Sequence, residues 1–420
     1  MNLNFKTFVL ILFCIYCGNV TATAAVKKQT VYHAVVSLDS TGDYTSVQAA
    51  VDAAPDNSKE PYRILIKKGF YEEHLEIPAS KTNICLIGAS PDQVIIGEST
   101  HVGEPMRTIQ GKKVRSGTVV NVYGDGFHAE NISFKNLWGM EKKAGPQALA
   151  LNTFADRVIL KNCKLLSFQD TYLTTTRNPT DRHYLKNCYI EGAVDFIYGS
   201  GNVVFDSCTI GINRKSGGYI VAPAHSPLVP WGYVFLNCSI VPKQDSTDVW
   251  LGRPWHKTPK TVFIHTTTHV KIRPAGWVDK MGGLPAIFAE FDTKDAQGNI
   301  VDLSQRRTSY WIWKDASKVE KLTGEALSVL STSEAACYTV RNVLSGSDAW
   351  QPDKSCASLN STLIRRTETN LKWNKNPEAV GYLCFVNGQL VGITDNNSLS
   401  LKTAKTDRIE VRAVNSSGGF

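Results

Sequence analysis

The sequence KNCKL at residues 161–165 returns as KNCYI at residues 186–190, as DSCTI at residues 206–210 and as LNCSI at residues 236–240. An earlier stretch, ENISF at residues 130–134, has the same order of polar and apolar residues. Each copy alternates polar and apolar side chains and ends on a large apolar one, which is the period of a strand with one buried face. The pattern therefore predicts a short strand every 20 to 31 residues.

A solenoid of stacked coils accounts for repeats of this length with one short strand in each. Their spacing is too irregular for leucine-rich repeats, whereas a parallel β-helix tolerates it because insertions leave the stack as loops. NICL at residues 83–86 is an earlier copy of the same strand. We therefore expect an all-β fold, a parallel β-helix, with ladders of asparagine and cysteine inside it.

One helix is expected before the repeats, over residues 44–54. Apolar residues recur at helical spacing from Val47 to Ala54, and Pro55 ends the pattern. Such a helix would cover the N-terminal end of the solenoid, where unpaired backbone groups are otherwise exposed.

The cysteines of adjacent coils are candidates for cross-linking. Cys188 and Cys208 have the same place in two successive repeats, so their Cα atoms are expected about 5 Å apart, which is within disulfide range. We favour a disulfide between them, with a stacked pair of buried free thiols as the alternative. A local disulfide between Cys337 and Cys356 is left open by the sequence.

The N-terminus has the features of an export signal. Lys6 is followed by an apolar run over residues 8–16 and then by Ala22-Thr23-Ala24, a small-x-small cleavage pattern. We expect a signal peptide over residues 1–24, cleavage near Ala24 and a secreted or periplasmic protein. The apolar run is too short to span a bilayer and no later stretch is long enough, so no membrane span is expected.

Charge and composition narrow the range of partners. The formal net charge of +8 suits a polyanionic partner, although it also serves solubility. The sequence has no dense lysine or arginine run, so nucleic acid is not an expected partner. The part after Ala24 has no cysteine and histidine cluster with metal-ligand spacing, and no metal is expected. A closed solenoid needs no partner subunit, and a monomer is expected.

Two aspartates share one phase of the repeat. Asp170 lies eight residues after Asn162, and Asp195 lies eight residues after Asn187. Stacked coils would therefore place both carboxylates side by side on one surface. Since two like charges that close repel, one is expected to be protonated or paired with a cation. Such a pair is a candidate for acid–base or nucleophilic chemistry.

Neighbouring polar residues are consistent with a reaction centre. The amides of Gln169 and of Gln147, about one coil earlier, could donate hydrogen bonds to a developing oxyanion. Arg253 supplies a charge able to keep one aspartate ionised, and Trp255 offers a flat face for a sugar ring. Structural ladders, an arginine that bridges loops and a core tryptophan are the alternative interpretations.

Five motifs, in their order along the chain, resemble the signature of the pectin methylesterases. The resemblance covers about residues 35 to 356, and near its end YTV at residues 338–340 and WQP at residues 350–352 are similar to the C-terminal pattern of the family. The five motifs are GFYEE at residues 69–73, QALAL at 147–151, QDT at 169–171, GAVDFIYG at 192–199 and LGRPW at 251–255.

The resemblance implies a right-handed parallel β-helix of the pectin lyase-like type that hydrolyses C6 methyl esters of homogalacturonan to pectate and methanol. Asp195 would be the nucleophile, and Asp170 the general acid and then the general base. Gln147 and Gln169 would hold the oxyanion, and Arg253 would orient Asp195 and keep it ionised. The implied mechanism uses side chains and water alone, so no cofactor is expected.

The resemblance also implies substrate-binding positions and shows two departures. Trp255, Tyr198, Phe168 and Thr118 would line the sugar subsites. The family has leucine and then tyrosine after its QDT, whereas here the order is Tyr172 and then Leu173, which moves the aromatic ring to the other face of a strand. Tyr198 stands where phenylalanine is common and adds a hydroxyl group.

The residues after the resemblance predict a separate β-rich module. Alternating runs at residues 371–373 and 382–386, an Asn387-Gly388 turn and a final run at residues 408–414 indicate short strands and a hairpin. We expect a β-helix domain over residues 25–356 and a module over residues 357–420, reminiscent of a fibronectin type III domain but short for one. It would pack on the end of the solenoid or bind carbohydrate.

Three other functions compete with pectin methyl-ester hydrolysis. A β-helical polygalacturonase or lyase would also use paired carboxylates on the same polymer. A non-catalytic carbohydrate-binding solenoid would have no need for the full set of aspartates, glutamines and arginine. Hydrolysis of another ester is possible on the same side chains, although Trp255 and Tyr198 favour a sugar.

Overall fold

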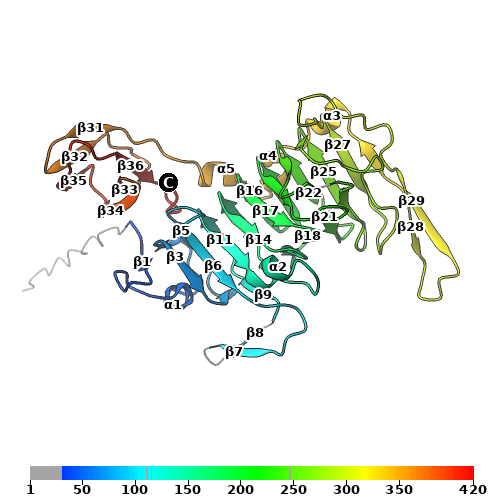
Figure 1. Ribbon diagram of the computed structural model, residues 1–420, viewed down its shortest axis with the longest axis horizontal. Helices are drawn as coiled ribbons and strands as arrows, with labels where there is room; N and C mark the ends of the chain where they lie inside the picture. The colour runs from blue at the N-terminus through cyan, green and yellow to red at the C-terminus, as the bar shows by residue number, and fades with distance from the viewer. Residues whose placement is uncertain (1–30, 110–111, 115, 246) are drawn as a thin grey trace, which may run out of the picture.

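A computed structural model describes residues 31–109, 112–114, 116–245 and 247–420, so the predicted signal peptide lies outside the described residues. Three parallel sheets of 11, 8 and 7 strands form the central solenoid (Figure 1). Each coil of the chain contributes strands to the sheets in turn, and each strand pairs in parallel with its equivalent in the next coil. The predicted all-β parallel β-helix is therefore confirmed.

We call the three sheets A, B and C. Sheet A contains β1 (Ala34–Val36), β2 (Tyr62–Ile66), β5 (Ile84–Gly88), β10 (His128–Glu130), β13 (Val158–Lys161), β16 (Arg182–Lys186), β19 (Asn202–Asp206), β22 (Tyr233–Leu236), β25 (Lys260–Ile264), β27 (Ile287–Phe291) and β30 (Leu327–Val329). Sheet B contains β3 (Gly69–Glu72), β6 (Val94–Glu98), β11 (Ser133–Asn136), β14 (Lys164–Leu166), β17 (Tyr189–Gly192), β20 (Thr209–Ile212), β23 (Ser239–Pro242) and β26 (Thr267–Thr268). Sheet C contains β4 (Leu75–Ile77), β9 (Thr118–Val122), β12 (Leu149–Phe154), β15 (Tyr172–Thr175), β18 (Val194–Gly199), β21 (Tyr219–Pro223) and β24 (Trp250–Gly252).

The other elements are short helices, two hairpins and the C-terminal module. The helices are α1 (Val47–Asp52), α2 (Leu137–Lys142), α3 (Thr332–Ala335), α4 (Val340–Leu344) and α5 (Pro352–Ser355). The hairpins are β7 (Arg107–Ile109) with β8 (Lys112–Val114), and β28 (Ser309–Trp313) with β29 (Lys321–Glu325). The module has two antiparallel sheets, made of β31 (Leu363–Arg366), β32 (Asn370–Trp373) and β35 (Ser398–Ser400), and of β33 (Gly381–Val386), β34 (Gln389–Thr394) and β36 (Ile409–Val414).

The repeated asparagines form a ladder, but at a corner of the coil and not inside it. Asn131, Asn162, Asn187 and Asn237 all have φ between 49° and 61°, which is the left-handed conformation, and each joins a strand of sheet A to one of sheet B. Asparagine is among the few residues that adopt this conformation readily. The Asn162 amide donates to the side-chain oxygen of Asn131 at 2.6 Å, yet Asn162 itself is exposed. The expected interior position is therefore wrong for Asn162, Asn187 and Asn237, which are exposed, whereas Asn131 is buried.

The repeated cysteines do form an interior ladder, with free thiols. Cys163, Cys188, Cys208 and Cys238 are buried in successive coils, and none of them is in a disulfide. The Cys188 thiol donates to the Leu160 carbonyl at 3.4 Å, and the other thiols of the ladder make similar contacts. The predicted disulfide between Cys188 and Cys208 is therefore wrong in this structure, because each thiol fills its place as a small apolar group. Cys337 and Cys356 are also free.

Aromatic rings continue the interior stacking. Phe205, Phe235 and Phe263 occupy matching positions of β19, β22 and β25, and all three are fully buried. Their ring centroids lie 4.2 Å and 4.3 Å apart, and the rings are nearly parallel. The spacing is slightly shorter than the roughly 4.8 Å between paired strands, so one ring per coil can pack against the ring of the next coil.

Helix α1 lies at the N-terminal end of the stack, where the sequence predicts a helix. The Ser46 side chain accepts a hydrogen bond from the Ala49 amide, and the Glu73 carboxylate accepts from Val47 and Gln48. These bonds satisfy amides at the start of the helix that have no partner within it. The apolar side of α1 packs against β1 and β4 and joins the interior core.

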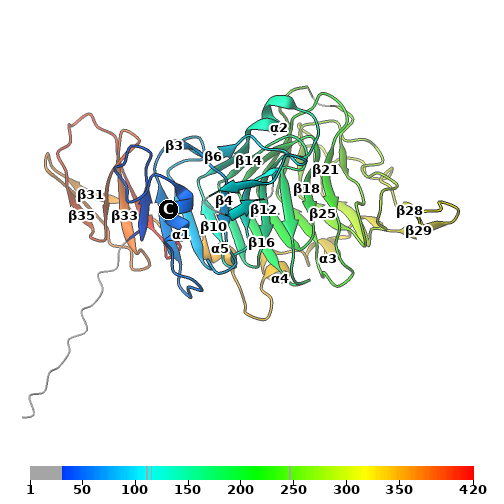
Figure 2. The same cartoon turned by 90° about the horizontal axis from the view of Figure 1, so that it is seen from below.

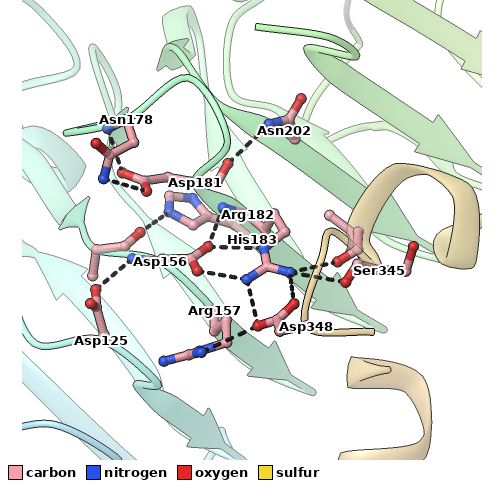
Figure 3. Close-up of polar contacts among 12 residues, drawn as sticks. Asp125, Asp156, Arg157, Asn178, Asp181, Arg182, His183, Asn202, Ser345 and Asp348 are labelled. Carbon is pink, nitrogen blue, oxygen red and sulfur yellow. Dashed lines mark hydrogen bonds and ion pairs between the residues drawn. The ribbon is translucent and has the colours of Figure 1, made fainter. Parts of the chain in front are cut away.

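The chain returns along the outer face of sheet A after completing the coils (Figure 2). Outward-facing Ile159, Val204 and Val234 are covered by residues of the α3–α4 segment, among them Leu330 and Leu344. Arg182 on β16 fixes this segment in place, because its guanidinium bonds Asp156 on one side and the Ser345 carbonyl and Asp348 on the other (Figure 3).

The C-terminal module covers the same face of the first coils. Leu383 and Phe385 of β33 pack with Leu65 of β2 and Ile87 of β5 in one buried cluster. The Tyr32 hydroxyl donates to the Gly418 carbonyl at 2.8 Å. Packing on the solenoid, one of the two expected roles of the module, is therefore observed at the first coils, while its likeness to a fibronectin type III domain stays a prediction.

We expect Phe235→Ala to lower the free energy of unfolding by about 3–5 kcal/mol, because it opens a cavity in the middle of the aromatic stack. Urea unfolding followed by tryptophan fluorescence measures the change. Leu228→Ala, at a side chain that is 75% exposed, is the control and should change stability by less than about 0.5 kcal/mol. Equal effects of the two substitutions would contradict the proposed core stacking.

Candidate active site

The two aspartates lie side by side on consecutive coils, as their spacing in the sequence predicts. Gln169 pairs in parallel with Val194, and the Asp170 amide donates to the Val194 carbonyl at 3.0 Å. Asp170 and Asp195 both have left-handed backbone conformations, with φ of 62° and 49°. Non-glycine residues in this region cluster at functional sites, where the surrounding structure holds them.

Arg253 binds Asp195 through two hydrogen bonds. Its Nε lies 2.7 Å from Asp195 Oδ1, and its Nη2 bonds Oδ2. The guanidinium carbon lies 4.2 Å from the centre of the Tyr219 ring, so an aromatic face fixes the plane of the cation. Sequence analysis missed Tyr219, although the repeat phase could have found it, because it pairs with Val194 in the next coil.

Burial raises the pKa of both carboxyls, but the neighbouring groups act differently on the two pKa values. Burial, followed by the charge of Asp195, raises the pKa of Asp170 to about 7, while hydrogen bonds from Tyr198 and Gln169 and the charge of Arg253 act to lower it. Burial also raises the pKa of Asp195, against the direct bonds and charge of Arg253. Asp170 is therefore suited to hold a proton near neutral pH and Asp195 to remain the anion.

A cavity of about 660 Å³ opens beside Asp170. Its walls come from the sheet C strands β9, β12, β15 and β18 and from the loops on either side of them. The Tyr198 and Trp255 rings meet edge to face in its wall, with centroids 5.4 Å apart at 62°. Of the residues singled out in the sequence, those lining it are Thr118, Gln147, Asp170, Leu173, Tyr198 and Trp255.

A second hollow of about 480 Å³ lies at Gln169 and Val194. Phe168 lines this hollow, and so do three cationic residues that sequence analysis did not single out, Lys143, Arg214 and Lys215. Asp170 lines the first hollow, while Gln169 and Val194, the neighbours of the two aspartates in the chain, line the second.

The exchange of Tyr172 and Leu173 has the predicted structural effect. Tyr172 points into the coil, where it is fully buried and its hydroxyl lies 3.2 Å from Thr153 Oγ1. Leu173 points outward and lines the first cavity. The cavity thus has an aliphatic wall at this position.

Within the described parts of the chain, no group of three or more histidine, cysteine, aspartate or glutamate side chains is placed to hold a metal ion. Among these same residues, no helix is long and apolar enough to cross a membrane.

The model of the pectinesterase family matches residues 33–345 of this chain. The chain belongs to the pectinesterase family. Members of this family are carboxylic ester hydrolases, and this chain is therefore an enzyme of that class. The match includes the two aspartates, Arg253 and both hollows.

Similar proteins come from plants and bacteria. A pectinesterase from Petunia integrifolia is 32% identical over 308 residues, which are 70% of this chain and 76% of that protein. The Prunus persica pectinesterase/pectinesterase inhibitor PPE8B is 35% identical over 59% of this chain, and the chain spans about half of its length, 47%. The structure of pectin methylesterase from carrot has a TM-score of 0.62 at 29% identity over 76% of this chain and 94% of that one.

We expect Arg253→Gln to raise the pKa of Asp195, because it removes the cation that opposes the effect of burial. Titration of the Asp195 carboxyl carbon by NMR measures the shift. Lys257→Gln is a matched control that removes a cation lining the same cavity, and it should leave that pKa nearly unchanged. An unchanged pKa in the Arg253 variant would show that the ion pair does not keep Asp195 ionised.

Proposed function

We propose that this chain hydrolyses the C6 methyl esters of homogalacturonan, giving pectate and methanol, with Asp195 as the nucleophile. One observation carries the proposal: an aspartate bound by arginine through two bonds lies beside a second aspartate whose pKa is about 7. Family membership supports ester hydrolysis over cleavage of the polymer chain.

In the first half of the reaction, an Asp195 oxygen attacks the ester carbonyl carbon. Asp170 gives its proton to the methoxy oxygen as the bond to the carbonyl carbon breaks, so methanol leaves and an acyl-enzyme anhydride remains. In the second half, the Asp170 carboxylate takes a proton from water as that water attacks the acyl carbon. Asp195 then leaves as a carboxylate, and Asp170 is protonated again for the next cycle.

Arg253 has a consistent role in both halves. Bidentate binding holds the Asp195 carboxylate in one orientation, and the arginine charge favours the anion, which is the reactive form. A guanidinium that stays charged also stabilises Asp195 as a leaving group in the second half.

Gln147 and Gln169 are proposed to donate hydrogen bonds to the tetrahedral oxyanion. Gln147 lines the cavity beside Asp170, and Gln169 directly precedes Asp170 and lines the other hollow. A neutral amide suits this task, because it stabilises developing charge without binding the uncharged ester strongly.

Sugar binding is proposed for the walls of the two hollows. The Trp255 and Tyr198 rings offer apolar faces, with Thr118 in the same wall, and Phe168 does so in the second hollow. A polysaccharide substrate also fits export of the protein through the signal peptide predicted for residues 1–24, and action as a monomer.

We expect Asp195→Asn to reduce methanol release from highly methylated pectin by at least about 10⁴-fold, because the amide is a poor nucleophile. Asp170→Asn should reduce it by roughly 10²- to 10⁴-fold, because no proton reaches the leaving group. Methanol is assayed without added calcium, and viscosity is followed in parallel.

Asp92→Asn, at an exposed carboxylate far along the chain from the pair, is the control and should retain wild-type activity. Loss of viscosity without methanol would assign the site to cleavage of the polymer. Full activity of a folded Asp195→Asn variant would reject Asp195 as the nucleophile.

The pH profile should report the protonation of Asp170. Activity is expected to fall above pH about 7, where Asp170 loses the proton that it gives to methanol. Tyr198→Phe removes a hydrogen bond that lowers the pKa of Asp170, so that pKa should rise and the alkaline limb of kcat/KM should move to higher pH. A shift of this limb to lower pH, or no shift, would contradict the assignment of Asp170 as the acid.

A further inference from the structure

The hairpin of β28 and β29 extends beyond the last coils, outside the three parallel sheets (Figures 1 and 2). Its two faces differ in their surroundings. Tyr310 on one face is buried and meets Phe288 of the solenoid core edge to face, at 5.8 Å between centroids. Trp311 and Trp313 alternate with it along the strand, and Trp313 pairs with Lys321 across the hairpin.

Two lysines surround the indole rings. Lys321 Nζ lies 4.3 Å from the centre of the Trp311 ring and 5.4 Å from that of Trp313. Lys280 Nζ, from a neighbouring loop, lies 4.6 Å from the centre of the Trp311 ring. The rings themselves meet edge to face at 5.2 Å. The hairpin therefore displays two adjacent aromatic faces with two ammonium groups beside them.

These rings do not serve the core of the part of the chain that the structure describes. Neither Trp311 nor Trp313 belongs to any of its buried apolar clusters. Trp313 is 37% exposed, and Leu322 on the opposite strand is 38% exposed. An exposed tryptophan beside a half-buried one and two cations is typical of surfaces that bind a partner.

The hairpin contacts the coil that follows the last residue lining the active-site cavity. The cavity is lined by residues from successive coils, from Val102 to Lys257, so it runs in the direction in which the coils stack. Lys257 pairs in parallel with Gly283 of the next coil. Asp279, in the loop that precedes Gly283, accepts two hydrogen bonds from Trp311. The Trp311 amide donates to the Asp279 carbonyl at 3.1 Å, and the indole N–H donates to the Asp279 carboxylate at 3.3 Å. A chain that left the cavity in this direction would meet the hairpin next.

We propose that Trp311, Trp313, Lys280 and Lys321 form an auxiliary subsite for the de-esterified part of a homogalacturonan chain whose esterified part occupies the cavity. The inference rests on the proposed function, because that reaction turns neutral esters into carboxylates. The exposed Trp313 ring packs against the apolar face of a sugar ring, and the two ammonium groups that lie over the Trp311 ring pair with carboxylates. A polyuronate is favoured over a neutral glycan because Lys280 and Lys321 place two positive charges beside one indole ring, that of Trp311.

The test measures binding of unesterified polygalacturonate and of its trimer by isothermal titration calorimetry with the full chain. We expect the double variant Trp313→Ala/Lys321→Ala to bind the polymer roughly tenfold more weakly than wild type does, with trimer affinity within about twofold. Lys314→Ala is the matched control. It removes the same charge from the same hairpin, at a lysine paired with Glu320, and should bind both ligands as wild type does.

Lys321→Glu is a second variant that keeps both rings and changes only an exposed side chain, so it tests the subsite without risk to the fold. It should weaken polymer binding at low salt, and the loss should shrink as salt screens the charge. Wild-type affinity for the polymer in both hairpin variants would overturn the inference, whether or not methanol is released. If the wild type releases no methanol but the hairpin variants lose affinity for the polymer, the proposed function is rejected and the hairpin remains a polyuronate site.

Discussion

Parallel pairing between successive coils is the constraint on which the rest of this structure depends. Paired strands lie about 4.8 Å apart, so any residue type that recurs at one phase of the repeat is held in contact with its copies. Phe205, Phe235 and Phe263 gain from this spacing, since it is the distance at which flat rings stack. This spacing stabilises the cysteine ladder less than the stacked rings. The thiols nevertheless fit the distance between coils and donate hydrogen bonds to backbone carbonyls. Every contact of this kind follows from register alone, before any tertiary packing is considered.

The same constraint has the opposite effect on Asp170 and Asp195. A spacing that stabilises stacked rings forces two carboxylates together, and burial withdraws the water that would screen them. The two carboxyl groups are stabilised in different ways. Arg253 binds Asp195 through two hydrogen bonds, whereas the raised pKa of Asp170 lets it hold a proton near neutral pH. In the proposed reaction, this inequality lets one pair of identical side chains provide both the nucleophile and the acid. The proposed chemistry thus depends on a close contact that the register creates.

The sequence predicts those features of the structure that follow from the repeat, and it misses those that do not. The coil architecture and the adjacency of Asp170 and Asp195 were predictable, because phase determines them. Alternation wrongly predicts an interior position for Asn162, Asn187 and Asn237, because it cannot reveal a left-handed φ, which depends on backbone geometry and not on polarity. The Cys188–Cys208 disulfide is predicted from strand spacing alone, but both thiols are free, since each fits the core and donates to a backbone carbonyl. Lys143 and the β28–β29 hairpin lie in insertions, where repeat phase carries no information.

The return of the chain along sheet A has a consequence for how the molecule unfolds. In an open solenoid each coil touches only its neighbours, so the terminal coils fray independently of the rest. Here residues 386 positions apart in the sequence, Tyr32 and Gly418, share a hydrogen bond, and β33 closes over β2 and β5. The first coils to leave the ribosome therefore keep an apolar outer face uncovered until the last strands are made. Long-range closure of this kind slows folding, but it joins both ends of a linear stack into one cooperative unit.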